Sequence, residues 1–308
     1  MESVVQLHGR RYVLRPLAAH EVAQVNGMLR AEYGPCYPYP LCEDRLTLRG
    51  VYIVCVDDRH EIVAFAKAEY REPHGFYEVG GLIIAPAHRV AGLGSCIVQH
   101  CVDETYRRGA KIVFAEPVCY RNDHASQKLF LRRGFGHCAV EPFKYPHIQL
   151  QHLGAQPETV TVCVLPPPGG VLDQGHALFV PADYASRLER LLERPLASGR
   201  PVLLAHRMPR TVDYAAIDFE GYLGATFRDV PANWPEAQQV IDAARAEGFC
   251  LSGVLPGFGR MDDGTSYDYV RLYRPSSGFR PDFSLVHVVP ALHPFLDGMR
   301  AELAHRYG

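Results

Sequence analysis

The sequence predicts a mixed α/β fold divided between two domains. The chain has 308 residues, roughly twice the length of a common single domain. Both halves alternate short apolar runs, typical of strands, with longer segments of helical periodicity. Hydrophobic residues make up 47% and charged residues 21% of the chain, which favours packed cores over disorder. We expect one domain at residues 1–150 and another at 156–308, with a linker at 146–158, where Gln, His, Pro and Gly gather without periodicity.

The first half is expected to form a mixed sheet covered by helices. Apolar residues that recur every three to four positions, as Val22, Val25 and Leu29 do, predict a helix. The polar turn at residues 57–60 separates two apolar runs and predicts a hairpin. In chain order we expect a strand at 11–15, a helix at 18–33, the hairpin strands at 51–56 and 62–68, a strand at 77–85, a helix at 94–108, a strand at 111–116, a helix at 123–133, and a strand opened by Gly134 and Phe135.

The second half repeats part of this order. A helix followed by Gly248 and Phe249 leads into an apolar strand, as the earlier helix leads through Gly134 and Phe135. We expect a strand at 159–165, a strand end at 179–181 with a helix at 184–192, a helix at 235–247, and strands at 250–255 and 267–273.

Composition excludes several functional classes. The 32 basic residues face 34 acidic ones, so a strongly basic surface for nucleic acid is not expected. No stretch has the apolar core of a signal peptide or the length of a membrane span, which predicts a soluble cytoplasmic protein with no membrane partner. Nine scattered cysteines favour free buried thiols, and the histidines lack metal-ligand spacing, so no metal is expected. The oligomeric state stays open, with a homodimer among the alternatives.

Chemistry first becomes visible in the loop at residues 86–95. Arg89, Gly92 and Gly94 lie between an apolar strand and an amphipathic helix. Amide groups at the start of a helix bind anions, and glycine lets the backbone approach a pyrophosphate closely. Glycines in such a loop also serve simply to make a tight turn, so the pattern alone leaves both interpretations open.

Arg-x-x-Gly-x-Gly at this place resembles the coenzyme A pyrophosphate loop of the GNAT acetyltransferase superfamily, and the order of elements over residues 3–145 is similar too. Ser126-Gln127-Lys128 followed by Gly134-Phe135 resembles bacterial tandem GNAT modules that are fused to anti-sigma-factor-like ATPase domains. The resemblance implies a GNAT fold followed by a second, degenerate GNAT-like half. Because that half has no Arg-x-x-Gly-x-Gly, it is expected to have no coenzyme site.

The resemblance also implies how an acyl-CoA, such as acetyl-CoA, would bind as cosubstrate. The strand before the loop splays from its neighbour, its backbone bonds to the pantetheine arm, and one of its amides faces the developing oxyanion. The coenzyme-binding residues implied are Leu82, Ile83, Ile84, Arg89, Val90, Ala91, Gly92, Leu93, Gly94, Ser95, Asn122 and Ser126.

Acyl transfer to an amine requires a base that removes a proton from the ammonium group. Glu78 is the first candidate, since it lies four residues before Leu82 and period-two alternation would place both on one face. Glu116, at the end of the next strand, is the second. A solvated strand-end carboxylate remains the alternative interpretation of Glu78. Many GNAT members have a tyrosine acid where this sequence has Phe130, so Tyr120, Tyr77 or water would protonate the thiolate.

Two functions follow from these residues. One is an N-acyltransferase that moves an acetyl or other short acyl group from coenzyme A to a primary amine of a small molecule or peptide by direct attack. The other is a non-catalytic acyl-CoA-binding regulatory module. Cys119 could in principle carry the acyl group, but the sequence places no base beside it, so a buried thiol is the preferred interpretation. The acceptor itself cannot be deduced from the residues.

Overall fold

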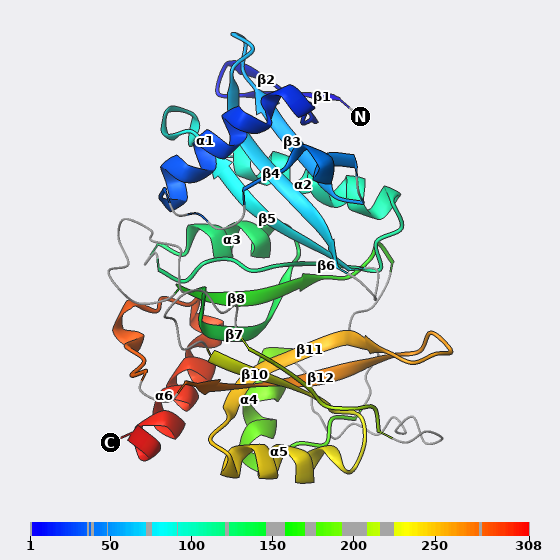
Figure 1. Ribbon diagram of the computed structural model, residues 1–308, viewed down its shortest axis with the longest axis vertical. Helices are drawn as coiled ribbons and strands as arrows, with labels where there is room; N and C mark the ends of the chain where they lie inside the picture. Colours follow the sequence, from blue (N-terminus) through cyan, green and yellow to red (C-terminus); the bar gives the residue numbers. More distant parts are fainter. Residues whose placement is uncertain are drawn as a thin grey trace.

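Helices and strands of the first half pack in layers (Figure 1). The computed structural model describes residues 2–35, 37, 40–47, 49–71, 76–90, 92–120, 123–145, 158–169, 177–192, 208–215, 225–276 and 279–307. On one face of the sheet, α2 (Leu93–Arg107) buries Leu93, Ile97 and Cys101 against the strands. On the other, α1 (Val22–Tyr33) buries Val25 and Leu29. The mixed α/β class predicted from the sequence is therefore confirmed.

All described strands join one twelve-stranded sheet in the order β1-β2-β3-β4-β5-β6-β8-β7-β11-β12-β10-β9. Neighbouring strands are antiparallel except β5 and β6, which are parallel. The strands are β1 (Ser3–Leu7), β2 (Arg10–Pro16), β3 (Val51–Val56), β4 (Ile62–Arg71), β5 (Phe76–Ile84), β6 (Ile112–Ala115), β7 (Gly136–Tyr145), β8 (Glu158–Leu165), β9 (Val212–Ala215), β10 (Ala225–Pro231), β11 (Cys250–Arg260) and β12 (Ser266–Pro275).

The remaining helices are mostly short. They are α3 (Ala125–Arg132), α4 (Ala182–Leu192), α5 (Ala237–Ala246) and α6 (His293–Tyr307), with 3₁₀ turns at Ala19–Glu21, Glu43–Thr47, Pro86–His88, Phe283–Leu285 and Pro290–Leu292. In Figure 1, α4, α5 and α6 surround the lower end of the sheet, where they share one apolar core with β10, β11 and β12. None of the described helices is long and apolar enough to cross a membrane.

Most of the expected elements form, with ends shifted by a few residues. Periodicity did not predict β1, β9, β10 or α6. β1 is an edge strand joined to β2 by a two-residue turn in which His8 and Gly9 both have positive φ, at 50° and 77°. Histidine is a weak marker of such a turn, in which Asn or Asp usually stands before the glycine.

The placement of β8 differs from the expectation. We expected this strand to open the second half, but it lies between β6 and β7 and completes the sheet of the first half. Glu158, expected at the end of the linker, is the first residue of β8, while 146–157 lie outside the described residues. Strand pairing, which local sequence does not encode, decides this boundary.

The two halves meet at β7 and β11. The order β6-β8-β7 on one side faces the mirrored order β11-β12-β10 on the other, and α3 precedes β7 as α5 precedes β11. The strands touch where Gly253 is opposite Ala139. A Cβ atom on Gly253 would lie 2.3 Å from the Cys138 carbonyl oxygen, so only glycine permits this backbone contact.

Candidate functional site

The loop before α2 has the backbone that its glycine pattern predicts. Gly92 caps the helix with φ of 100°, a left-handed conformation that a side chain would strain. The first amides of α2, including those of Gly94 and Ser95, have no acceptor within the helix and point out of its N-terminus. They therefore form the kind of positively polarised end that binds phosphate groups.

Gly94 also has a packing role. A Cβ atom at this position would lie 2.8 Å from Leu129 of α3 and 3.2 Å from Ile84 of β5. The absence of a side chain thus lets α2 approach both elements as well as leaving the amides accessible. A bulky residue at Gly94 would disturb packing, so it would be a poor probe of ligand binding by itself.

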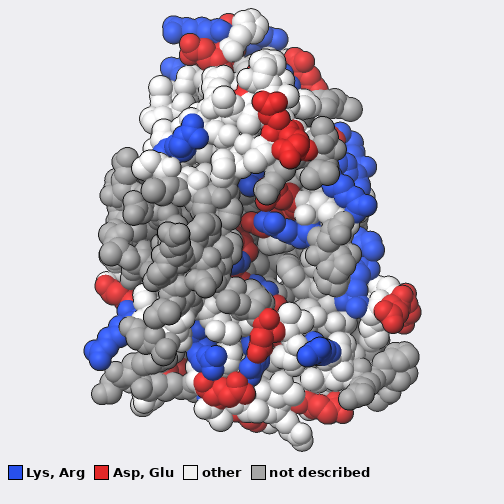
Figure 2. Space-filling model, in the orientation of Figure 1, with Lys and Arg blue, Asp and Glu red and all other residues white. Residues whose placement is uncertain are grey.

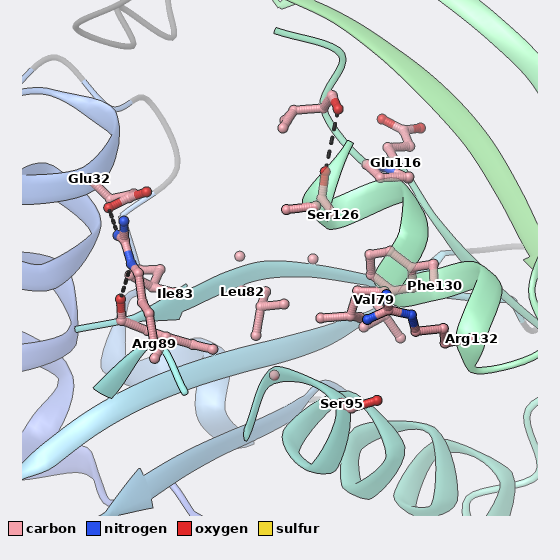
Figure 3. A pocket seen from close by; sticks show the side chains of 18 of the residues that line it. Glu32, Val79, Leu82, Ile83, Arg89, Ser95, Glu116, Ser126, Phe130 and Arg132 are labelled. Atoms are coloured by element: carbon pink, nitrogen blue, oxygen red, sulfur yellow. Dashed lines mark hydrogen bonds and ion pairs between the residues drawn. The ribbon is translucent and has the colours of Figure 1, made fainter. Parts of the chain in front are cut away.

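The charge of Arg89 is already paired. Its guanidinium group donates to Glu32 of α1 at 2.6 Å, and its Nε donates to the Ile84 carbonyl oxygen at 3.0 Å. Figure 3 shows this pair on one side of the cavity, with Phe130 and Arg132 on the other. Arg89 fastens the loop to α1 and to β5, so it shapes the cavity wall as well as contributing charge.

A cavity of about 460 Å³ lies between the N-termini of α2 and α3 and the end of β5 (Figure 3). Most of the coenzyme residues expected from the sequence line it: Leu82, Ile83, Ile84, Arg89, Val90, Gly92, Gly94, Ser95 and Ser126. Leu93 instead packs fully buried in the core under α2. Ala91 and Asn122 lie outside the described residues. Ser126 donates to the Val118 carbonyl oxygen at 3.3 Å, which anchors α3 to the cavity edge.

The expected splay between β5 and β6 is present. Their parallel pairing runs only from Phe76 to Val79 on β5, so the β6-facing backbone of residues 80–84 is available to the cavity. The Tyr33 hydroxyl donates to the Leu82 carbonyl oxygen at 3.4 Å from the α1 side. An extended chain of amides, such as a pantetheine arm, fits this open strand edge.

The expectation that Glu78 and Leu82 share a face is wrong. The pairing of β5 with β4 slips between Lys67–Gly80 and Phe65–Ile83, which marks a β-bulge on β5, and Gly81 there has φ of 59°. The extra residue shifts the alternation by one position. Leu82 therefore packs against the core between α2 and the sheet (the α2-side core), whereas Glu78 lines a separate pocket.

That second pocket has a volume of about 400 Å³ and is lined by both candidate carboxylates, Glu78 and Glu116. It adjoins the cavity of about 460 Å³ described above, which we call the coenzyme-type cavity. The two share six lining residues: Tyr33, Val79, Gly80, Gly81, Glu116 and Val118. Its remaining lining residues are Tyr37, Lys67, Glu69, Arg71, Glu78, Tyr145, Glu158 and Val160. In Figure 2, acidic and basic side chains are interspersed over the visible face, and both signs meet near its centre.

Both carboxylates proposed from the sequence as bases have cationic partners. Arg71 donates to Glu78 through Nε at 2.8 Å and also through Nη2. Lys144 donates to Glu116 at 2.6 Å, and the Tyr145 hydroxyl donates to its other oxygen. Burial raises the pKa of Glu116, although the neighbouring Lys144 opposes that shift. Glu116 thus has two fixed hydrogen bonds and stands at the junction of the cavities.

Glu158 was not among the residues selected from the sequence. Its side chain is almost completely buried in the second pocket, and neither of its oxygens has a hydrogen-bond partner among the described residues. Burial, with a smaller contribution from the charge of Glu116, raises the pKa of Glu158 from 4.5 to about 8. The local signal was weak: a single carboxylate directly before the apolar run at 159–165.

The candidate acids differ in position. Tyr120 lines the coenzyme-type cavity together with Phe130. Tyr77 is buried in the α2-side core and lines neither of these cavities. Burial and the charge of Glu158 raise the pKa of the Cys119 thiol well above its usual value, so this group stays protonated. A protonated, buried thiol is a poor nucleophile, which favours the interpretation of Cys119 as a core residue.

Two arginines near the cavity were also missed, of which only Arg132 lines it. Arg132 at the end of α3 lines the cavity, and Arg133 donates through Nε to the Ser95 hydroxyl. They add positive charge near the start of α2, where an anionic group would bind. Within the described part of the chain, no group of three or more His, Cys, Asp or Glu side chains could hold a metal ion.

Residues 21–135 match the profile of the Acetyltransferase (GNAT) family. This segment, which is less than half of the chain, is therefore similar to GNAT acetyltransferases. It contains the glycine loop, the broken β5–β6 ladder and α3, which together bound the cavity. The comparison with curated proteins gave no match.

Several solved structures resemble about half of the chain. The ribosomal-protein-S18-alanine N-acetyltransferase of Escherichia coli is 18% identical, with a TM-score of 0.40, and the match covers 51% of this chain and 94% of that one. An N-acetyltransferase of Staphylococcus aureus is 13% identical, with a TM-score of 0.42 and coverages of 50% and 98%. The ribosomal-protein-S5-alanine acetyltransferase of Vibrio fischeri is 14% identical, with a TM-score of 0.41 and coverages of 55% and 99%.

Proposed function

We propose that the protein transfers an acetyl or other short acyl group from coenzyme A to a primary amine. One observation carries this proposal: two cavities meet at the break in the β5–β6 ladder, one beside a helix N-terminus and the other lined by carboxylates. Acyl transfer needs both substrates to reach the same atoms from opposite sides. The shared backbone of Val79–Gly81 is where thioester and amine would meet.

Each reactant has residues suited to it. The α2 amides, Arg132 and Arg133 provide an anion site for pyrophosphate, and the open edge of β5 suits an amide-bearing arm. In the second pocket Glu158 takes the proton of the ammonium group, and the free amine then attacks the thioester carbonyl carbon. The new C–N bond replaces the C–S bond, and the second proton that the nitrogen loses passes through Tyr120 or water to the departing thiolate. Glu116 provides negative charge beside Glu158 and favours a cationic acceptor.

The second half is proposed to be a GNAT-like unit without a coenzyme site. The mirrored strand order and the paired Gly-Phe turns before β7 and β11 support this division. No Arg-x-x-Gly-x-Gly occurs in residues 156–308. Its role would be to support the first half rather than to bind a second coenzyme.

Release of free coenzyme A tests the proposed function. Acetyl-CoA mixed with the protein should give thiol, detected with a thiol-reactive dye, only when a suitable primary amine is added. Peptide N-termini, polyamines and amino sugars form a sensible first panel, and mass spectrometry should identify the acetylated product. Tight acetyl-CoA binding without acylation of any amine would instead favour the non-catalytic acyl-CoA-binding module.

The coenzyme site can be tested separately with Ser95→Asp. A carboxylate in the first turn of α2 is compatible with the helix dipole, so the fold should remain intact. It should repel the pyrophosphate and weaken acetyl-CoA binding at least about tenfold by calorimetry, a like-charge effect worth more than about 1 kcal/mol. Ser95→Asn, which has similar size and no charge, should bind within a few fold of the parent. Equal affinity in both variants would contradict this site.

A further inference from the structure

Buried charged side chains connect the second pocket, which we call the acceptor pocket because the amine is proposed to bind there, with the second half of the chain. Glu116 at the pocket wall accepts from Lys144 at 2.6 Å, and Lys144 also donates to Glu141 at 2.6 Å. The other oxygen of Glu141 accepts from Arg271 of β12. Arg271 in turn donates to both oxygens of Asp229 on β10, at 2.8 and 2.7 Å. Negative and positive groups thus alternate from the pocket into the second half.

Local backbone irregularities bring these groups together. In β7, the pairing with β8 shifts between Glu141 and Tyr145, and Phe143 has a positive φ of 54°. This bulge lets Lys144 and Tyr145 both reach Glu116 from the strand that contains Glu141. Where β11 meets β7, Gly253 of β11 is paired with Arg271 of β12 and touches Ala139 of β7. This contact brings Arg271 to Glu141.

Arg271 neutralises a carboxylate that water cannot reach. The Glu141 side chain is completely buried, and Arg271 is about nine-tenths buried. Burial alone would raise the pKa of Glu141, but Lys144 and Arg271 outweigh it and hold that pKa below the usual range. With Arg271 present, Glu141 has two cationic partners, and Lys144 is shared between Glu141 and Glu116. Without it, Glu141 would hold Lys144 alone and draw it from Glu116.

We propose that Arg271 is a positioning residue for the acceptor pocket, which it controls by keeping Lys144 hydrogen-bonded to Glu116 through Glu141. The second half then contributes to the reaction of the first without touching substrate. The consequence for turnover rests on the proposed acyltransferase function, but the effect on Glu116 does not. Titration of Glu116 can therefore test this proposal even if no acceptor is found.

The titration of Glu116 depends on several neighbours, which a test must keep constant. Charged or titratable groups come from every element packed around it: Arg71 on β4, Glu78 on β5, Glu141, Lys144 and Tyr145 on β7, and Glu158 on β8. Substituting Arg271 leaves all of these side chains in the protein and removes a direct hydrogen-bond partner from only one of them, Glu141. A shift of the Glu116 titration in such a variant would then report the loss of Lys144 as its partner.

Carboxyl ¹³C resonances of glutamate-labelled full-length protein provide the measurement, with Glu116 assigned by its loss in Glu116→Gln. In Arg271→Met the Glu116 pKa should rise by about one unit or more, as expected when a nearby cation moves away. Arg271→Lys keeps the charge and should restore most of the parental titration. Where an acceptor is known, turnover should fall in Arg271→Met while acetyl-CoA affinity stays within a few fold.

Two further variants separate positioning from general support. Arg228→Met removes a comparable arginine of β10, which pairs with Asp213 and Glu247 away from the pocket, and should leave Glu116 unchanged. Glu141→Gln/Arg271→Met removes both charges of one pair, returns Lys144 to Glu116, and should bring the Glu116 pKa back to or below the parental value. If Arg271→Met alone does not fold, the Glu116 titration in this double variant still tests the proposal. An unchanged Glu116 titration in Arg271→Met, or a double variant that fails to reverse its shift, would overturn the proposal.

Discussion

Glu158→Gln should reduce turnover by roughly 100-fold or more, the usual contribution of a general base. Glutamine keeps the volume of the side chain but cannot take up a proton. Because Glu158 lines the second pocket and not the coenzyme-type cavity, acetyl-CoA affinity should stay near the parental value. A fall in rate without loss of coenzyme binding would identify an interaction that acts in the transition state.

The pH dependence of kcat/KM should show that Glu158 acts in its ionised form. Glu158 acts as a base only when ionised, and its pKa is raised to about 8. In the parent, kcat/KM should therefore increase with pH, reach half of its maximum near pH 8 and level off above it. No sharp fall is expected at higher pH, because residue 130 is Phe and no tyrosine there can lose a proton. The decrease of kcat/KM at low pH should be absent from the residual activity of Glu158→Gln.

Glu69→Gln is a suitable control for that experiment. Glu69 lines the same pocket, but Lys67 pairs with it at 2.8 Å, so it is less available as a base. The Glu69 variant should keep its rate within a few fold. If Glu158→Gln is fully active at every pH while Glu78→Gln or Glu116→Gln is not, the base is one of the carboxylates first proposed from the sequence.

The same substitution should make the protein more stable at high pH. In the folded state the Glu158 pKa is about 8, against an ordinary value of 4.5. Between these values the folded protein retains a proton that the unfolded chain has released, so stability falls as pH rises from about 4.5 to 8. At about 1.4 kcal/mol per pKa unit, the full shift corresponds to roughly 4 to 5 kcal/mol. Because glutamine does not ionise, the Glu158→Gln protein does not lose this stability as the pH rises.

Urea unfolding of parent and variant between pH 5 and 8.5 measures the effect. The advantage of Glu158→Gln should be small at pH 5 and grow by several kcal/mol towards pH 8, the upper limit being set by the full pKa shift. Taking the difference between the two proteins cancels the titration of other groups. A difference that does not change with pH would mean that Glu158 ionises normally in the folded protein, and both predictions for it would fail.

Local sequence by itself determined most strands and helices of the first half, β1 excepted, and the glycine loop before α2. Gly92 shows why: its left-handed backbone is a local requirement that glycine meets, and it is readable from the residue type. The hairpin of β3 and β4 and the apolar face of α2 likewise follow from periodicity within short segments. Such features depend on neighbours in the chain, which a sequence displays directly.

Only the tertiary structure decided which carboxylates line the second pocket. The bulge at Gly81 separates Glu78 from Leu82, because one extra residue reverses a two-residue alternation. Glu158 enters the pocket because β8 inserts between β6 and β7, and Arg271 reaches Glu141 because Gly253 lets two distant strands touch. Desolvation and pairing depend on groups far apart in the chain, and these decide whether a carboxylate is a structural partner or a base.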